Sequence, residues 1–166
     1  MLQFEKPIYK ITDSIESNFY GRFELEPLER GFGTTIGNAL RRVMLSSLPG
    51  SAISSIRIDG VLHEFQTIDG VYEDVTTIIL NLKGVVFKNH SNEPKTVRIN
   101  ATKEGEVTAG DIECDPDVEV INKDKVICTL SKGASLNMEM TVTNGRGYVD
   151  SKENKKEILP IIITNL

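Results

Sequence analysis

Hydrophobic and polar side chains alternate along the first part of the chain. Between Phe19 and Leu25 the alternation has a period of two residues, and more widely spaced apolar positions precede it. A period of two is typical of a half-buried β-strand, because successive side chains point to opposite faces of a sheet. Pro27 ends the run, since proline has no amide N–H to offer a strand partner. We therefore predict two strands within residues 1–28.

A helical pattern follows the short link Gly31-Phe32-Gly33. Residues 34–48 contain no proline, with Thr34 or Thr35 as the expected N-cap and Pro49-Gly50 as the expected stop. At roughly 100° per residue the apolar side chains fall on one face. This face predicts a core or oligomer contact and comprises Ile36, Ala39, Leu40, Val43, Met44 and Ser47.

The opposite face of this helix combines an apolar side chain with arginines. Asn38, Arg41, Arg42 and Leu45 share it. Arginine beside a large apolar residue is typical of a protein-binding surface. An exposed leucine among solvated arginines is also common, so both interpretations remain open on composition alone.

Two Asp-Gly turns follow a predicted strand at Ile53–Ile58. The tetrapeptides Ile-Asp-Gly-Val at 58–61 and 68–71 are similar, and Asp-Gly favours tight turns. Two copies do not make a repeat architecture, so we interpret them as separate turns. Between them, Leu62–Phe65 is predicted to form a short strand.

A second helix is predicted from Tyr72 to Leu82. Glu73 and Asp74 are expected in its first turn, where the helix dipole favours anions, and Gly84 is expected to cap its C-terminus. Its apolar stripe comprises Val75, Ile78, Ile79 and Leu82.

Short β-like runs occupy the rest of the chain from Val85. Turn-forming residues separate them, including Asn144-Gly145, and this spacing favours a mainly antiparallel domain. The fold class predicted is α+β, with residues 50–160 as a unit distinct from 1–48. The runs are 85–87, 96–99, 118–121, 126–130 and 136–142.

Composition and charge narrow the function classes. The 166 residues are 39% hydrophobic and 26% charged, which is ordinary for a globular protein. No apolar run approaches the ~20 residues that span a bilayer, and the first 20 residues lack a signal-peptide core. We expect a soluble, cytoplasmic protein. The net charge of −5 disfavours binding to nucleic-acid phosphates, so partners are expected to be proteins.

No catalytic or metal-binding constellation is evident. Cys114 and Cys128 do not form a Cys-x-x-Cys pair, so reduced thiols in a β-domain are favoured over zinc. His63 has no nearby nucleophile motif. The glycines before the first helix do not fit a phosphate-binding loop. The dinucleotide-binding fingerprint needs its third glycine at position 36, which is Ile36 here. A P-loop needs a lysine at the helix start, and no lysine occurs from residue 11 to residue 82. We predict no cofactor and no metal.

Alternating carboxylates mark residues 111–119. A solvent-exposed face of a strand or loop is the favoured interpretation of these carboxylates. A weak divalent-cation site is the alternative, and the spacing leaves both open. The acidic residues are Asp111, Glu113, Asp115, Asp117 and Glu119.

Five segments, in the same order, resemble the N-terminal assembly domain of α subunits of bacterial-type DNA-directed RNA polymerase. They are residues 25–50 (LEPLERGFGTTIGNALRRVMLSSLPG), 58–65 (IDGVLHEF), 70–75 (GVYEDV), 80–84 (LNLKG) and 144–149 (NGRGYV). An ordered match over nearly the whole chain is more specific than any short motif.

The resemblance implies a two-part architecture. Residues 1–48 correspond to the first half of a dimerisation subdomain, and residues 49–166 to a β-rich insert. The second half of the dimerisation subdomain, with its long helix, would follow residue 166. The apolar run at 158–166 also leads us to expect that the parent chain continues.

The resemblance also implies a role. In such proteins two α chains dimerise and form the platform on which the catalytic β and β′ subunits assemble. The chain is then a subunit of a nucleotidyltransferase without catalytic residues of its own, and neither DNA nor membrane contact is expected. The implied β contact comprises Asn38, Arg41, Arg42 and Leu45. A second large-subunit contact region comprises Glu73, Asp74, Lys83 and Gly84. The dimer or core face comprises Ile36, Leu40, Val43 and Met44.

A rival hypothesis is a stand-alone binding module or small enzyme that uses the β-rich part. It requires a pocket or metal site that the sequence does not indicate.

Overall fold

A computed structural model describes residues 6–16, 20–150 and 153 of the chain. The chain divides into two compact units, Met1–Leu45 and Ser46–Leu166, which are described separately below. The prediction that residues 1–48 are half of a dimerisation subdomain and that 49–166 are an insert stays a prediction. The apolar run at 158–166 lies outside the described residues.

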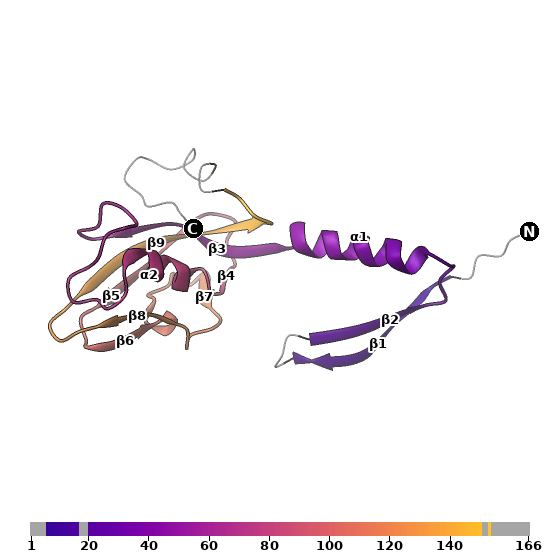
Figure 1. The fold of residues 1–166 in the computed structure, drawn as a ribbon, viewed down its shortest axis with the longest axis horizontal. Coiled ribbons are helices and arrows are strands. Elements are labelled where there is room, and N and C mark those ends of the chain that lie inside the picture. Colours follow the sequence, from indigo (N-terminus) through magenta and orange to yellow (C-terminus); the bar gives the residue numbers. More distant parts are fainter. Residues whose placement is uncertain (1–5, 17–19, 151–152, 154–166) are drawn as a thin grey trace, which may run out of the picture. The chain divides into compact units, whose positions relative to one another are not determined.

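The first unit contains an antiparallel hairpin and most of a helix. The strands are β1, Ile8–Ile15, and β2, Tyr20–Glu26, as Figure 1 shows. Both were predicted; Phe19, where the alternation begins, lies outside the described residues. A bulge interrupts the register at Thr12, whose Oγ1 donates to the Arg22 carbonyl at 3.2 Å.

Helix α1 spans Phe32–Ser46, so it begins and ends two residues before the predicted bounds. The predicted N-caps Thr34 and Thr35 are wrong, because both lie inside the helix. Gly31 adopts φ 93°, which suits glycine, and the Phe32 N–H donates to the Glu29 carbonyl at 3.1 Å. This turn starts the helix early.

The second unit is built on a five-stranded antiparallel sheet in the order β5-β9-β3-β4-β7. A two-stranded sheet, β6-β8, accompanies it. The strands of the large sheet are β3 (Pro49–Ile58), β4 (Phe87–Asn89), β5 (Lys95–Ala101), β7 (Val118–Val120) and β9 (Leu136–Arg146). The strands of the small sheet are β6 (Gly105–Thr108) and β8 (Val126–Leu130). The α+β class is confirmed.

A single apolar core joins the sheets to helix α2, Val75–Leu82. The predicted stripe of this helix is confirmed, since Val75, Ile78, Ile79 and Leu82 are all buried. The helix contacts β8, and the side chains of Ile56, Ile99 and Met140 from the large sheet are fully buried in the same core. Burying one such side chain typically stabilises a fold by about 1.5–3 kcal/mol.

Helix α2 starts three residues later than predicted. Glu73 and Asp74 therefore do not lie in its first turn. Asp74 is the N-cap and its Oδ1 accepts from the Thr77 N–H at 2.8 Å. The helix ends at Leu82 with Lys83 as C-cap. The Gly84 N–H donates to the Asn81 carbonyl at 3.0 Å without the left-handed conformation of a glycine cap.

The predicted strand at Leu62–Phe65 is wrong; the segment is a loop. Both Asp-Gly turns are confirmed, with φ 79° at Gly60 and 77° at Gly70. Between them the Gln66 side chain holds the backbone, because its Nε2 donates to the Gly60 carbonyl at 3.1 Å and its Oε1 accepts from the Leu62 N–H at 3.0 Å. These side-chain bonds replace a strand partner.

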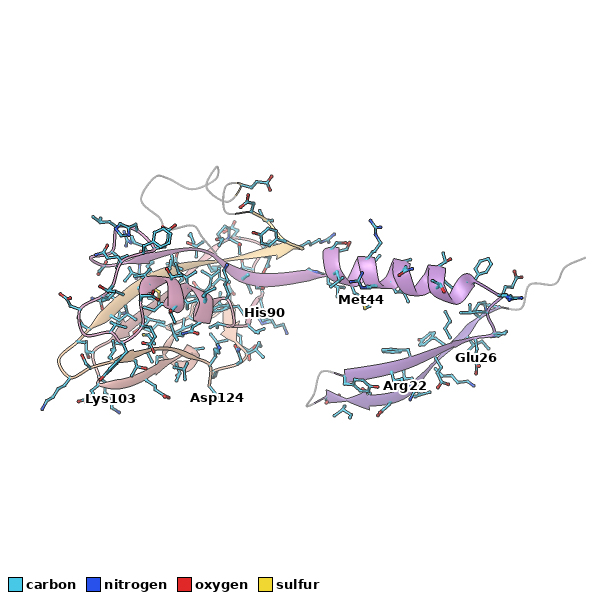
Figure 2. The ribbon with its side chains drawn as sticks, viewed as in Figure 1. Arg22, Glu26, Met44, His90, Lys103 and Asp124 are labelled. Atoms are coloured by element: carbon cyan, nitrogen blue, oxygen red, sulfur yellow. The ribbon has the colours of Figure 1, made fainter. Side chains whose placement is uncertain are left out.

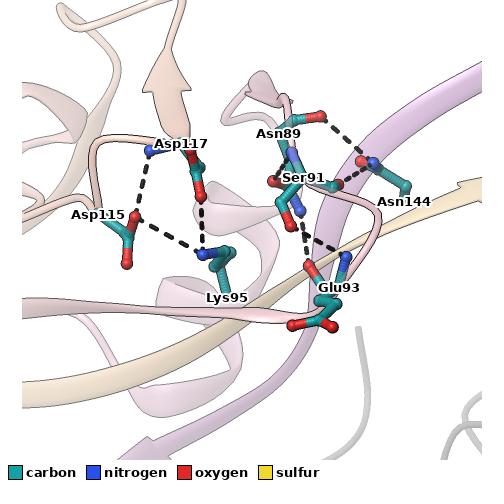
Figure 3. A network of polar contacts seen from close by, with 7 residues as sticks. All are labelled: Asn89, Ser91, Glu93, Lys95, Asp115, Asp117 and Asn144. Atoms are coloured by element: carbon teal, nitrogen blue, oxygen red, sulfur yellow. Dashed lines mark hydrogen bonds and ion pairs between the residues drawn. The ribbon is translucent and has the colours of Figure 1, made fainter.

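The predicted turn at Asn144-Gly145 is also wrong, because β9 runs through it to Arg146. Asn144 is held there on both sides. Its Oδ1 accepts from Ser51 Oγ at 2.7 Å, and its Nδ2 donates to the carbonyls of Asn89 and Ser91 at 3.2 and 2.8 Å (Figure 3). Long-range bonds of this kind cannot be read from a dipeptide. Strand β6 and the short 3-10 helix η2, Ala109–Asp111, were not predicted.

Candidate functional site

The residues of the polar face of α1 are exposed to solvent. Asn38, Arg41, Arg42 and Leu45 are exposed, and the exposed fraction of Leu45 is 68%. Their spacing of three, four and seven residues places them on one face of the continuous helix Phe32–Ser46. The structure therefore places two guanidinium groups, an amide and an isobutyl group on one exposed helix face; the predicted contact of this face with β stays a prediction.

The predicted dimer or core face of α1 is accessible as well. Leu40, Val43 and Met44 are more than half exposed, and Ile36 is partly buried. None of the helix residues is buried among the described residues. This face is therefore not part of a core within the first unit. Its role in dimerisation stays a prediction.

The β1–β2 hairpin shares this property. Among the described residues of the first unit, none is buried, although many are large and apolar. A helix and a hairpin of this size gain little stability alone, since tertiary burial supplies most of it. The first unit therefore presents apolar surface that fits association. The most exposed of these side chains are Ile8, Tyr9, Ile11, Phe23 and Leu45.

The predicted second contact region lies at the two ends of α2. Glu73 and Asp74 precede the helix, and Lys83 and Gly84 follow it. The eight helical residues between them correspond to about 12 Å along the axis. The structure therefore does not gather these four residues into one cluster; it forms two surfaces, one at each end of the helix.

The N-terminal end of α2 is rigidly built. Glu73 accepts two hydrogen bonds from Thr129 of β8, one from the backbone N–H and one from Oγ1, at 2.7 and 3.1 Å. Hydrogen bonds from the side chain and backbone N–H of Thr77 hold the pKa of Asp74 below its ordinary value. Both carboxylates therefore accept hydrogen bonds that stabilise this unit. Asp74 is exposed, whereas Glu73 is partly buried.

The loop before α2 presents apolar side chains that the sequence reasoning did not identify as a surface. The exposed fractions are 87% for Leu62, 80% for Phe65 and 77% for Tyr72. The Gln66 bonds described above fix this loop, and the Val75 N–H donates to the Gln66 carbonyl at 3.1 Å. Exposed large apolar groups on a fixed loop are typical of a contact surface. The sequence reasoning missed this surface because it predicted a strand at residues 62–65.

The alternating carboxylates are divided among different partners. Asp117 and Asp115 face Lys95 at 2.8 and 3.8 Å, as Figure 3 shows. Asp111 accepts from the Thr108 N–H at 2.7 Å, and Glu113 accepts from Asn100 Nδ2 at 3.3 Å. Glu119 lies opposite Lys88. In the part of the chain that the structure describes, no three His, Cys, Asp or Glu residues are grouped to hold a metal ion.

Both cysteines are free thiols in the second unit. Cys128 lies in β8 and is fully buried, and burial, with a smaller contribution from Glu73, raises its pKa to about 12. Burial also raises the pKa of Cys114, which is only partly covered.

The described part of the chain holds no helix long and apolar enough to cross a membrane. Figure 2 shows that side chains crowd the interior of the second unit.

Comparison with known proteins agrees with this architecture. A family model described as the RNA polymerase Rpb3/RpoA insert domain matches residues 56–164, which is more than half of the chain. The chain belongs to this family. The matched range covers nearly all of the second unit.

Curated relatives extend the similarity to the first unit. The chain is 57% identical over 160 residues to the DNA-directed RNA polymerase subunit alpha of Alkaliphilus oremlandii, a match that covers 96% of the chain and 50% of that relative. The corresponding subunits of Symbiobacterium thermophilum and Moorella thermoacetica are 56% and 58% identical over 161 residues. Each match covers 97% of the chain and 51% of the relative. The chain thus spans about half the length of the relatives it matches.

Proposed function

We propose that this chain provides the N-terminal assembly part of an RNA polymerase α subunit. In this proposal two α chains form the platform that recruits the catalytic β and β′ subunits. The chain is a cytoplasmic subunit of a nucleotidyltransferase, contributes no catalytic group, cofactor or metal, and does not contact DNA directly. Relatives named as polymerase α subunits, together with the insert-domain match, support this assignment.

The observation that carries the proposal is the accessibility of both faces of α1. One face offers Leu40, Val43 and Met44, and the other offers Arg42 and Leu45. A helix that contacts one neighbour usually leaves the other face polar and solvated. Apolar groups on both faces fit a helix that contacts two partners, a second α chain on one side and a large subunit on the other.

Each residue of the polar face has a proposed role. Leu45 is an apolar anchor that becomes buried against β, and Arg42 donates hydrogen bonds to acceptors on β. Arg41 and Asn38 support that contact at its edge. Truncation of a buried anchor at a protein interface typically costs about 2 kcal/mol or more of binding free energy.

The two ends of α2 supply the second proposed contact region with a large subunit. Glu73 is anchored by Thr129, so its part is to hold the loop that presents Tyr72. Asp74 is exposed at the helix N-terminus, and Lys83 is exposed at the C-terminus. The region therefore offers a partner charges of opposite sign at opposite ends of one short helix.

The proposal is tested by capture of purified β with the tagged chain. Arg42→Ala and Leu45→Ala should each reduce capture about tenfold or more, while thermal unfolding stays unchanged. Arg30→Ala, an exposed arginine before α1, is the matched control and should bind as the unaltered chain does. Undiminished capture by folded Arg42→Ala and Leu45→Ala variants would contradict the assigned face.

A further inference from the structure

The turn after α2 is joined to the turn between β7 and β8 by one amide side chain. Asn122 Nδ2 donates to the Gly84 carbonyl at 2.8 Å, and Asn122 Oδ1 accepts from the Val86 N–H at 2.8 Å. The Lys125 N–H donates to the Asn122 carbonyl at 3.1 Å. Two segments 36 to 38 residues apart in sequence therefore form one fixed surface.

Gly84 allows a lysine side chain to lie against this surface. A Cβ at position 84 would approach Lys125 Cε to 2.9 Å and Lys125 Nζ to 3.5 Å. The side chain of Lys125 thus covers Gly84 because glycine leaves the space open. Gly84 directly follows the exposed Lys83 in the sequence.

An exposed apolar pair adjoins these lysines. The Ile121 N–H donates to the Val86 carbonyl at 2.9 Å, so the two residues lie opposite each other at the start of the β4–β7 pair. The exposed fractions are 51% for Val86 and 48% for Ile121. Their neighbours Val85, Phe87 and Val120 are buried. The alternation therefore turns Val86 and Ile121 outward.

The charge of this surface is uneven. Its two segments, residues 83–88 and 119–125, carry four lysines, Lys83, Lys88, Lys123 and Lys125, and two carboxylates, Glu119 and Asp124; Glu119 lies opposite Lys88 in the β4–β7 register. The ion pairs among the described residues involve neither Lys83 nor Lys125. By contrast, no lysine or arginine occurs between Asp59 and Leu82, where the loop before α2 carries five carboxylates. An acidic partner segment is therefore favoured at the C-terminal end of α2 and disfavoured at its N-terminal end.

We infer that Lys83, Gly84, Val86, Ile121 and Lys125 form one docking surface, here called the lysine surface. It binds an acidic segment of a large polymerase subunit that also carries an apolar side chain. The apolar side chain covers Val86 and Ile121, and the carboxylates face Lys83 and Lys125. The identity of the partner rests on the proposed function; the composition of the surface rests on the geometry above.

Charge reversal at Lys125 tests the inference. The whole chain is titrated with purified β and with purified β′, and Lys125→Glu should weaken binding of one of them about tenfold. Lys132→Glu, an exposed turn lysine elsewhere on the second unit, is the matched control and should bind within about twofold of the unaltered chain. Binding by the unaltered chain should weaken as salt rises, more steeply than binding by Lys125→Glu.

A second pair of variants tests the position of Lys125 rather than its charge. Gly84→Ala should displace the flexible end of Lys125 with little loss of stability, because the close approach involves Cε of a long side chain. It should weaken binding when Lys125 is present and add nothing further in a Lys125→Ala background. Equal effects of Gly84→Ala in both backgrounds would overturn the role of Lys125.

The outcomes separate the inference from the proposed function. If Arg42→Ala weakens capture but Lys125→Glu and Val86→Ser bind both large subunits as the unaltered chain does, the lysine surface is overturned and the assembly role is supported. If the unaltered chain binds neither β nor β′, both are overturned. Thermal unfolding of each variant excludes misfolding as the cause of any loss.

Discussion

Glu73 and Thr129 are joined by two hydrogen bonds that fasten the loop before α2 to strand β8. Glu73 Oε2 accepts from the Thr129 N–H at 2.7 Å, and Oε1 accepts from Thr129 Oγ1 at 3.1 Å. The residues are 56 positions apart in sequence. This link fixes the direction in which α2 enters the core and holds Tyr72 on the surface.

Glu73→Ala should destabilise the second unit by about 1–3 kcal/mol, because it removes a charged acceptor and leaves the Thr129 N–H without its partner. Glu73→Gln keeps one oxygen acceptor and should recover part of the loss. Urea unfolding measures both variants. Glu104→Gln, at an exposed turn, is the control and should change stability by no more than about 0.5 kcal/mol. Equal stability of Glu73→Ala and the unaltered chain would show that the link is not stabilising.

Ile78→Ala should cost about 2–5 kcal/mol of unfolding free energy, since Ile78 is fully buried and its truncation leaves a cavity under α2. Leu80→Ala on the same helix is the matched control. Leu80 is 59% exposed, so its truncation should cost about 0.5 kcal/mol or less. Denaturant unfolding followed by circular dichroism compares the two. Similar losses for both variants would contradict the assigned orientation of α2.

The two thiols should differ in reactivity. Burial raises the pKa of Cys128 to about 12, so its thiolate is scarce at pH 8 and the sulfur is covered. Cys114 is only partly covered and should react first with an aromatic disulfide reagent. We expect slow release of one equivalent of reporter from the native chain and of the second equivalent only on unfolding. Cys114→Ser should abolish the first phase; rapid native labelling of that variant would contradict the burial of Cys128.

The Lys95–Asp117 ion pair predicts a window of pH in which it stabilises the fold. The hydrogen bond from Lys95 lowers the pKa of Asp117 below 3.8, so this contribution is present above that value and is lost as the pH falls through the lowered pKa. The bond to Asp117 raises the pKa of Lys95 above 10.5, so the contribution is lost again as the pH rises through the raised pKa.

The window is measured by urea unfolding of Asp117→Asn at pH 3 and pH 7. The variant should be slightly less stable than the unaltered chain at pH 7, because ion pairs at the protein surface that water still reaches contribute little. The difference should shrink at pH 3. Asp124→Asn, at an exposed turn, serves as the control. A larger difference at pH 3 than at pH 7 would contradict the direction of the Asp117 shift.

Periodicity predicted the elements that local side-chain patterns determine. The strand at Val126–Leu130 matches its predicted bounds, and the buried stripe of α2 was identified residue by residue. In both cases the side chains facing the core recur at the period of the element itself. The polar face of α1 was located for the same reason, because Asn38, Arg41 and Leu45 follow helical spacing.

Errors arose where side-chain hydrogen bonds, some local and some between distant residues, decide the backbone conformation. Gln66 holds residues 60–62 as a loop, so the alternation at 62–65 does not produce a strand. Hydrogen bonds of the Asn144 side chain with Ser51 Oγ and with the Ser91 carbonyl hold Asn144 in β9. These bonds override the turn preference of Asn-Gly. Lys83 and Gly84 were predicted as contact residues, but their grouping with Lys125 was not, because Gly84 and Lys125 meet only in the folded chain.

The most direct measurement for the assembly role is photo-crosslinking from α1 in a reconstituted polymerase. A photo-reactive amino acid placed at Leu45 should crosslink to β, and an added Arg42→Ala substitution should reduce the yield about tenfold. The same probe at Thr102, on an exposed turn of the second unit, provides the background yield. Efficient crosslinking to β from Leu45 but not from Thr102 is the predicted result. A background yield at Leu45 in a polymerase that contains the chain would contradict the account.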